Sequence, residues 1–197
     1  NFLGNHMSGK LKIYENLYHW PDGLFKRFVY PKKINKIPGR DFLNNLEIPE
    51  EIDTIHVLGS ASEKSITFLK KKFNKDVIHS ELPFGSINKI LKLIPILKKN
   101  TLCILTLPTP KQEQVAEYIS QNQSTYKILC IGGALNMLTG HEKPCPKILE
   151  NYGLETIWRL RTDTYRRGSR LIRTLILFFY YGFFRGKLKN LKADLQG

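Results

Sequence analysis

Short apolar runs alternate with amphipathic segments along the middle of the chain. Four runs have the length and β-branched content of strands, and they lie at residues 54–59, 76–79, 101–107 and 127–131. Three segments with helical spacing alternate with them, at residues 62–73, 86–98 and 111–122. Strand and helix in this alternation predict an α/β fold: a Rossmann-like parallel sheet with helices on both faces.

Local signals set the expected ends of these elements. Ser60 or Ser62 is suited to cap the first helix, and Pro95 interrupts the second. Right-handed crossovers place the carboxyl ends of parallel strands at one edge of the sheet, where ligands bind in such folds. We therefore expect the ligand site in the turns after the strands.

The carboxyl-terminal part of the chain has a different character. From residue 156 onward it carries ten Lys and Arg residues against two Asp, and an apolar, aromatic run covers residues 174–184. Cations beside aromatic rings are typical of segments that lie at a membrane surface. We predict a core at residues 1–155 and a basic, apolar helical appendage at residues 156–197 that associates with membranes. A helix packed on the core is the alternative.

Composition and charge narrow the possible partners. The formal net charge of +14 indicates an anionic partner: nucleic acid, anionic lipid or a sugar nucleotide. The longest apolar stretch is about half of the roughly 20 residues that span a bilayer, so we expect no transmembrane helix and no secretory signal. The three cysteines lack metal-ligand spacing, which predicts no zinc site, and their small, odd number fits a reducing cytoplasm. Cys103 and Cys130 lie in apolar runs, so we expect packed thiols there.

Several polar residues stand where chemistry is expected. Asp22, in a Pro-Asp-Gly turn beside Trp20, could act as a base, although the residues alone favour an ordinary turn. Gln112 lies in a first helical turn at the ligand edge, where its amide could hydrogen-bond a sugar or base. The glycine pair Gly132 and Gly133 allows close approach of the backbone to a ligand.

The remaining candidates also have two interpretations each. Asn136 could contact a base or ribose, or it could stabilise a turn. Arg159, Arg166 and Arg170 are spaced by seven and four residues, so on a helix they share one face and could grip a diphosphate. A solvated basic face is the alternative for these three arginines.

The ordered set of motifs resembles the bacterial WecG/TagA/CpsF glycosyltransferases, glycosyltransferase family 26. The resemblance covers roughly residues 20–173, and no single motif in it is decisive. The matching pieces, in chain order, are Pro21-Asp22-Gly23, Lys36-Ile37-Pro38-Gly39-Arg40-Asp41, Pro110-Lys111-Gln112-Glu113, Gly132-Gly133-Ala134 with Asn136, Thr139-Gly140, Pro144-Cys145-Pro146, and Gly153-Leu154-Glu155 before Arg159.

The resemblance implies a peripheral enzyme on the cytoplasmic face of the bacterial membrane. Such an enzyme moves a sugar, typically N-acetylmannosamine, with inversion from a UDP-sugar to an undecaprenyl-diphosphate-linked acceptor, without a metal cofactor. Asp22 would be the general base. The donor contacts implied by the resemblance involve Asn5, Lys36, Gln112, Gly132, Gly133, Asn136, Arg159, Arg166 and Arg170.

This sequence departs from the family at three of those positions. Lys36 stands where the family usually has Arg, Asn136 stands where it has an acid, and Asn5 is the only stand-in for a Thr- or Asn-bearing strand. No nucleic acid partner is expected, and a homo-oligomer remains open. The alternatives are a degenerate family member without turnover and a non-enzymatic module that binds anionic lipid or nucleic acid.

Overall fold

A computed structural model describes residues 37–125, 127–140, 145–146, 148–149, 158 and 164–184. The chain divides into two compact units, one of Gly39–Pro144 and one of Asn1–Pro38 together with Cys145–Gly197. The predicted boundary at residues 155/156 stays a prediction. Of the candidate residues, Asn5, Asp22, Lys36 and Arg159 lie outside the described residues.

The Gly39–Pro144 unit contains a four-stranded sheet in which every pair of neighbouring strands is parallel. The strands are β1 (Thr54–Leu58), β2 (Asp76–Ser80), β3 (Thr101–Leu105) and β4 (Lys127–Cys130), in the order β2-β1-β3-β4. The register pairs Thr54 with both Asp76 and Thr101. The predicted parallel α/β sheet is confirmed.

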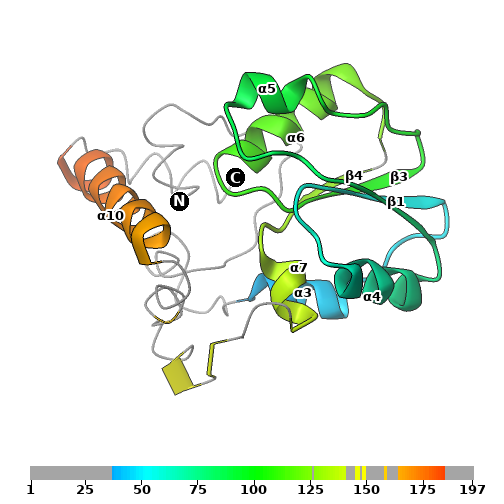
Figure 1. Cartoon of the computed structure of the whole chain (residues 1–197), viewed down its shortest axis with the longest axis horizontal. Helices are drawn as coiled ribbons and strands as arrows, with labels where there is room; N and C mark the ends of the chain where they lie inside the picture. The colour runs from blue at the N-terminus through cyan, green and yellow to red at the C-terminus, as the bar shows by residue number, and fades with distance from the viewer. Residues whose placement is uncertain are drawn as a thin grey trace. The chain divides into compact units, whose positions relative to one another are not determined.

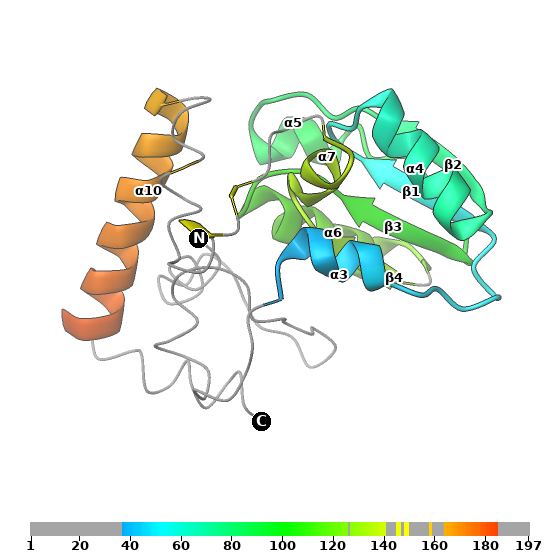
Figure 2. The same ribbon diagram turned by 90° about the horizontal axis from the view of Figure 1, so that it is seen from below.

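Helices cover both faces of this sheet, as the pattern predicted (Figure 1). One face carries α5 (Ile87–Leu91) and α6 (Lys111–Asn122). The other carries α4 (Glu63–Phe73), α7 (Ala134–Leu138) and α3 (Gly39–Asn45), and Figure 2 shows α3 beside α7. The strand order explains this division: the connection from β1 runs to one side of the sheet and the later connections run to the other.

Burial follows the sheet. All five residues of β1 and all five of β3 are buried, because these central strands are covered on both faces. The α5–α6 face closes over them with a cluster that includes Leu58, Ile90, Leu105, Val115 and Ile119. Burial of this apolar surface is the main driving force for folding of the unit.

The second helix is shorter than its pattern predicted. The expected helix at residues 86–98 ends at Leu91, and turns closed by Leu93 N–Ile90 O (3.0 Å) and Ile94 N–Leu91 O (3.5 Å) follow it. The ring of Pro95 would clash with the Leu91 carbonyl if the helix continued, which is the physical reason for the early end. The sequence patterns did not indicate the short helices α3 and α7.

In the other unit, the structure describes the helix α10 (Thr164–Phe179) and the π-helical turn η1 (Tyr180–Phe184) that follows it. Thr174 and Phe178 are buried, while Ile172, Ile176 and Phe179 are exposed. The predicted helical appendage therefore contains a helix here. Within the described parts of the chain, no helix is long and apolar enough to cross a membrane.

Candidate functional site

The candidate site lies at the carboxyl ends of β1, β3 and β4. The strand order reverses direction between β1 and β3, which is where ligands bind in open α/β sheets. Gly59 follows β1 at this point with φ +113°, and a Cβ on it would stand 2.6 Å from Thr106 Oγ1 and 3.4 Å from Leu107 N. Only glycine fits here, so the loops after β1 and β3 approach each other closely.

A hydrogen bond from a side chain joins the loops after β3 and β4. Oε1 of Gln112 accepts from the Gly132 amide at 3.0 Å, and this amide also reaches the Leu105 carbonyl at 3.2 Å. Gly132 has φ +54°, the left-handed conformation that glycine adopts without strain. Gln112 is buried, and it fixes the Gly-Gly turn at the ligand edge.

The other end of the Gln112 amide is also occupied. Its Nε2 donates to Thr109 Oγ1 (3.2 Å) and to Glu113 Oε1 (2.9 Å), and Thr109 Oγ1 donates to the same carboxylate oxygen at 2.8 Å. Gln112 was predicted to contact the sugar donor. The structure places it at the ligand edge but uses its amide within the protein, so its observed role is to position the loops.

Glu113 has one carboxylate oxygen without a hydrogen-bond partner. Oε2 is buried and unpaired, whereas Oε1 accepts the two bonds from Thr109 and Gln112. An ionised carboxylate oxygen without a partner is costly unless the charge is compensated, and the first turn of the twelve-residue helix α6 supplies favourable partial charge. Oε2 is therefore a buried acceptor that no hydrogen bond within the described chain satisfies.

A second set of side-chain hydrogen bonds joins the turn after β4 to the start of α4. Oδ1 of Asn136 accepts from the Ser62 amide (3.2 Å) and from Ser65 Oγ (3.0 Å). Ser62 is the N-cap of α4 as predicted, and its hydroxyl accepts from the Ser65 amide at 3.2 Å. The turn-stabilising interpretation of Asn136 is observed, because Oδ1 joins the loops, and the contact with a base or ribose stays a prediction. Nδ2 forms no hydrogen bond with the rest of the described chain.

The two glycines of the pair differ in exposure. Gly132 is partly buried and its amide is bonded, while Gly133 is exposed at the N-cap of α7. The Lys111 ammonium donates to the Gly85 carbonyl and so ties the loop before α5 to the first turn of α6. The described part of the edge thus consists of four loops, after β1, β2, β3 and β4, that are fixed to one another by side chains.

The titratable groups behind this edge are held neutral. Burial raises the pKa of the Cys103 thiol to about 12, and burial together with the Glu113 charge raises the pKa of Cys130 further. These two cysteines are thus packed thiols, as predicted, and they do not have the lowered pKa of reactive cysteines. Burial, and then the charge of His79, lowers the pKa of His56, whose Nε2 lies 2.9 Å from Ser80 Oγ.

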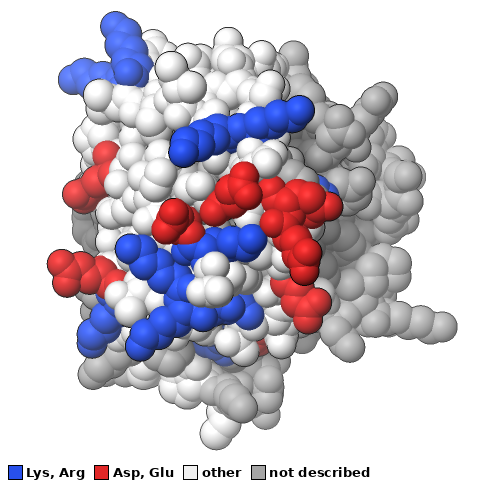
Figure 3. All heavy atoms as spheres, turned by 90° about the vertical axis from the view of Figure 1, so that its right-hand side faces the viewer, with Lys and Arg blue, Asp and Glu red and all other residues white. Residues whose placement is uncertain are grey.

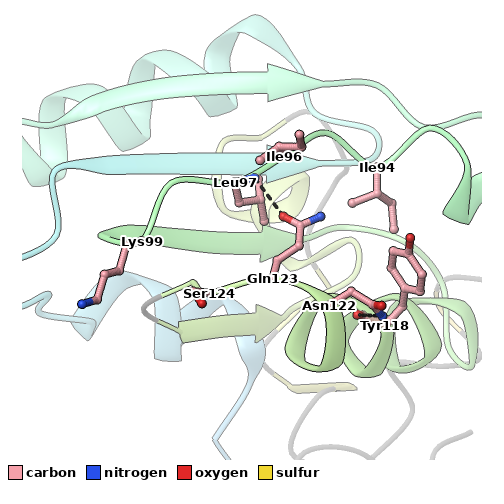
Figure 4. Close-up of a pocket in the computed structure, with 8 residues that line it drawn as sticks. All are labelled: Ile94, Ile96, Leu97, Lys99, Tyr118, Asn122, Gln123 and Ser124. Carbon is pink, nitrogen blue, oxygen red and sulfur yellow. Dashed lines mark hydrogen bonds between the residues drawn. The ribbon is translucent and has the colours of Figure 1, made fainter.

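Two cavities within the Gly39–Pro144 unit lie away from this edge. One of about 550 Å³ lies between the loop into β3 and the carboxyl-terminal half of α6, and its lining includes Ile94, Tyr118 and Gln123 (Figure 4). The other lies at the amino ends of β1 and β2. Figure 3 shows that this amino-terminal side carries basic and acidic residues together. We assign the site from the loop geometry at the carboxyl edge, where the topology places ligands.

Two predicted arginines fall on α10. Arg166 and Arg170 are four residues apart in this helix, which places them on one helix face, while their side chains lie outside the described residues. Within the described residues there is no group of three His, Cys, Asp or Glu that could hold a metal ion. The expectation of a metal-independent enzyme stays a prediction.

A comparison with protein-family models decides the family. The model of the glycosyl transferase WecG/TagA/CpsF family matches residues 24–193 of the 197. The chain belongs to this family. The predicted resemblance is confirmed, and the chain is by this membership a glycosyltransferase, whose partners are a sugar donor and an acceptor. Membership supports a role in polysaccharide biosynthesis.

The matched range includes most of the predicted site residues. Gln112, the glycine pair and Asn136 lie inside it, as do Lys36 and the three arginines. Asn5 and Asp22 precede its first residue, residue 24. The roles of individual residues remain predictions. From the sequence, Glu113 could equally be a functional residue at the ligand edge or a favourable charge near a helix start, and its unpaired oxygen becomes visible only in three dimensions.

Proposed function

We propose that this glycosyltransferase moves an N-acetylhexosamine, such as N-acetylmannosamine, from a UDP-sugar to a polyprenyl-diphosphate-linked acceptor with inversion. The reaction would serve bacterial surface polysaccharide biosynthesis. The observation that carries the proposal is the carboxyl edge of the sheet at its switch point, where the Gln112 and Asn136 hydrogen bonds join the loops, in a chain of this family. Fixed loops at this edge supply a rigid site for a nucleotide-linked ligand.

The groups left unpaired at this edge match the chemistry of such a donor. Asn136 Nδ2 can donate to a uracil carbonyl or a ribose hydroxyl, and the exposed Gly133 backbone permits close approach. In this assignment Gln112 holds the loops and the neighbouring residues meet the donor.

The transfer step needs a base and a stabilised leaving group. Asp22 would remove the proton from the acceptor hydroxyl, whose oxygen then attacks the anomeric carbon from the face opposite to UDP. The bond between that carbon and the diphosphate oxygen breaks, and the negative charge develops on UDP. Arg159, Arg166 and Arg170 would bind the leaving diphosphate, because guanidinium groups form paired hydrogen bonds with phosphate oxygens.

The proposal includes the place and partners of the reaction. We place the enzyme on the cytoplasmic face of the bacterial cell membrane, bound peripherally to anionic lipid, since a polyprenyl-diphosphate acceptor is anchored there. The aromatic and apolar residues of α10 and η1 that are exposed, among them Ile176, Phe179 and Phe183, support a surface role for this segment. No cofactor is required in this scheme.

Replacement of Asp22 tests the proposed chemistry. The Asp22→Asn variant should bind UDP with unchanged affinity and lose at least about a hundredfold of its transfer rate, because a missing general base typically costs that much. The matched control is Asp76→Asn, which removes a carboxylate at the opposite, amino end of a strand. Full transfer activity in Asp22→Asn would exclude Asp22 as the base.

A further inference from the structure

The connection from β2 to β3 carries an unusual charge pattern. Between Glu81 and Glu113 the sequence contains five lysines and no Asp or Glu. One of the five, Lys111, donates to the Gly85 carbonyl. The other four lie on α5 or in the loop after it and are exposed: Lys89, Lys92, Lys98 and Lys99.

The same segment separates its apolar residues into two sets. Ile90 and Leu97 are buried in the core cluster, and Ile94 packs against it. Leu93 and Ile96 point outward, with 55% and 94% of their side chains exposed. The core therefore accounts for one side of this segment, and two large aliphatic side chains remain in solvent in a stretch of sequence whose charged residues are all lysines.

The backbone holds these outward residues in place. The turns after α5 are closed by hydrogen bonds to Ile90 and Leu91, and the Leu97 amide donates to Gln123 Oε1 at 2.8 Å (Figure 4). Nε2 of Gln123 donates to the Pro95 carbonyl at 3.1 Å, so α6 fixes both sides of Ile96. The exposure of Ile96 is thus a property of an ordered loop.

We propose that this surface docks on the anionic headgroups of a lipid bilayer, with Leu93 and Ile96 inserted at the level of the acyl-chain boundary. We call the surface the basic apolar face, and it consists of Lys89, Leu93, Lys92, Ile96, Lys98 and Lys99. Lysines beside an anionic bilayer are attracted to it, and apolar side chains gain by leaving water. The inference concerns the Gly39–Pro144 unit and does not depend on the proposed donor, acceptor or carboxyl-terminal segment.

A bilayer fits this face better than another macromolecule does. Two copies that met through this face would bring lysines against lysines, which is unfavourable. The lysines could also meet the phosphates of nucleic acid, but such a contact would leave the aliphatic side chains of Leu93 and Ile96 without an apolar partner. Ile96 is almost fully exposed, so it protrudes, and a protruding aliphatic side chain inserts readily into deformable lipid, whereas a protein partner would need a matching pocket.

Vesicle binding of the full-length chain tests the proposal. Flotation is measured with vesicles of phosphatidylcholine containing 30% phosphatidylglycerol, without sugar donor or acceptor, at lipid concentrations below saturation. The Leu93→Ser/Ile96→Ser variant should lower the partition coefficient at least about tenfold, because each of the two side chains loses several CH₂ or CH₃ groups that the bilayer would bury. The Lys92→Gln/Lys98→Gln variant should lower it about fivefold for each lysine.

Matched control variants test whether vesicle binding depends on this face or on any exposed lysine or apolar residue of the unit. Lys64 and Lys71 are exposed on α4, on the other face of the sheet, and Ile78 is exposed on β2. Lys64→Gln/Lys71→Gln and Ile78→Ser should leave vesicle binding within twofold of the parent chain. Equal losses in the control and face variants would overturn the proposal, and so would unchanged binding in both face variants.

A fluorescent label at the proposed contact tests insertion into the bilayer without relying on the vesicle-binding affinity. An environment-sensitive fluorophore on an Ile96→Cys variant should shift to shorter wavelength with the anionic vesicles, and the same label on Lys64→Cys should not. An unshifted label at residue 96 on vesicle-bound protein would overturn the proposal. A change in sedimentation coefficient of Leu93→Ser/Ile96→Ser, without a change in vesicle binding, would instead identify the face as a contact between copies.

This test and the test of the proposed function fail separately. Vesicle binding contains no nucleotide, donor or transfer step, so a chain that binds UDP but loses nothing in the face variants would refute only the lipid contact. A chain that shows the expected vesicle results but no response to UDP would refute only the donor assignment.

Discussion

The Gln112 side chain accepts a hydrogen bond from the Gly132 amide at 3.0 Å, across twenty residues of sequence. This bond joins the first turn of α6 to the Gly-Gly turn after β4. The sequence suggested Gln112 as a ligand contact, and the structure shows that its side chain holds two loops of the ligand edge together.

Removal of this side chain should cost stability and nucleotide binding together. Gln112→Ala leaves the Gly132 amide with one partner and removes the donor to Thr109 and Glu113, so we expect unfolding to become easier by about 1–3 kcal/mol. UDP affinity should fall at temperatures where the variant is still folded. Urea denaturation and calorimetry measure the two effects, and stability equal to that of the parent chain would contradict this role of Gln112.

Asn136 offers a sharper separation of two roles. Asn136→Asp keeps an oxygen for the Ser62 amide and the Ser65 hydroxyl, so the midpoint of thermal unfolding should change by no more than a few degrees. The change replaces the Nδ2 donor by an acceptor, and UDP affinity should change. Asn136→Leu should lower stability by about 1–3 kcal/mol. Equal stability of the Leu and Asp variants would show that the hydrogen bonds contribute nothing.

The close approach at Gly59 predicts a strong effect of one methyl group. Gly59→Ala must place a Cβ 2.6 Å from Thr106 Oγ1 in a backbone with φ +113°, and we expect a loss of at least about 2 kcal/mol. Gly140→Ala is the control, since Gly140 also has a positive φ (+74°) but no atom within 4 Å. The difference between the variants measures the contact, and similar losses would refute it.

His56 should make stability depend on pH. Burial and the charge of His79 lower the pKa of His56 below its usual 6.5, so the unfolded chain binds its proton first as pH falls. The contribution of neutral His56 to folding stability is therefore present above pH 6.5 and is lost as pH falls below that value. In urea denaturation between pH 5 and 8, the free energy of unfolding should fall less toward acid pH in His56→Gln than in the parent chain. Parallel curves for the two proteins would argue against the assignment.

Arg166 is predicted to bind phosphate. Arg166→Ala should weaken UDP binding about tenfold or more and uridine binding by less than twofold, because only UDP carries the diphosphate. Calorimetric titrations with both ligands make the comparison, and Lys64→Ala, on α4 of the other unit, is the charge control. Equal losses for UDP and uridine would remove the phosphate role.

The fold was predictable where local pattern and burial agree. The strands and α6 followed from apolar runs and helical spacing, and the cap of α4 was narrowed to Ser60 or Ser62 because residue type and position are local signals; the structure has Ser62. The length of α5 was not predicted correctly, because the apolar spacing continues through Ile94 and Leu97 after the backbone has turned. Such a pattern reports which residues are buried and leaves the backbone conformation open.

The site was predictable only in part. The glycine pair, Gln112 and Asn136 were placed at the ligand edge because that edge follows from strand order. Their bonding partners could not be predicted, because Asn136 meets Ser62 and Ser65 across more than seventy residues. The unpaired Glu113 oxygen also depends on how α6 meets the loop before it.

Titration of the purified chain with UDP, in the presence of EDTA, tests the central claim most directly. ADP, GDP and uridine serve as comparisons, and calorimetry or the thermal unfolding midpoint reports binding. The account predicts that UDP binds at least tenfold more tightly than the other three ligands and raises the thermal unfolding midpoint more than they do. It also predicts that EDTA does not change UDP binding. A folded protein that does not respond to UDP, or that binds all nucleotides alike, would contradict it.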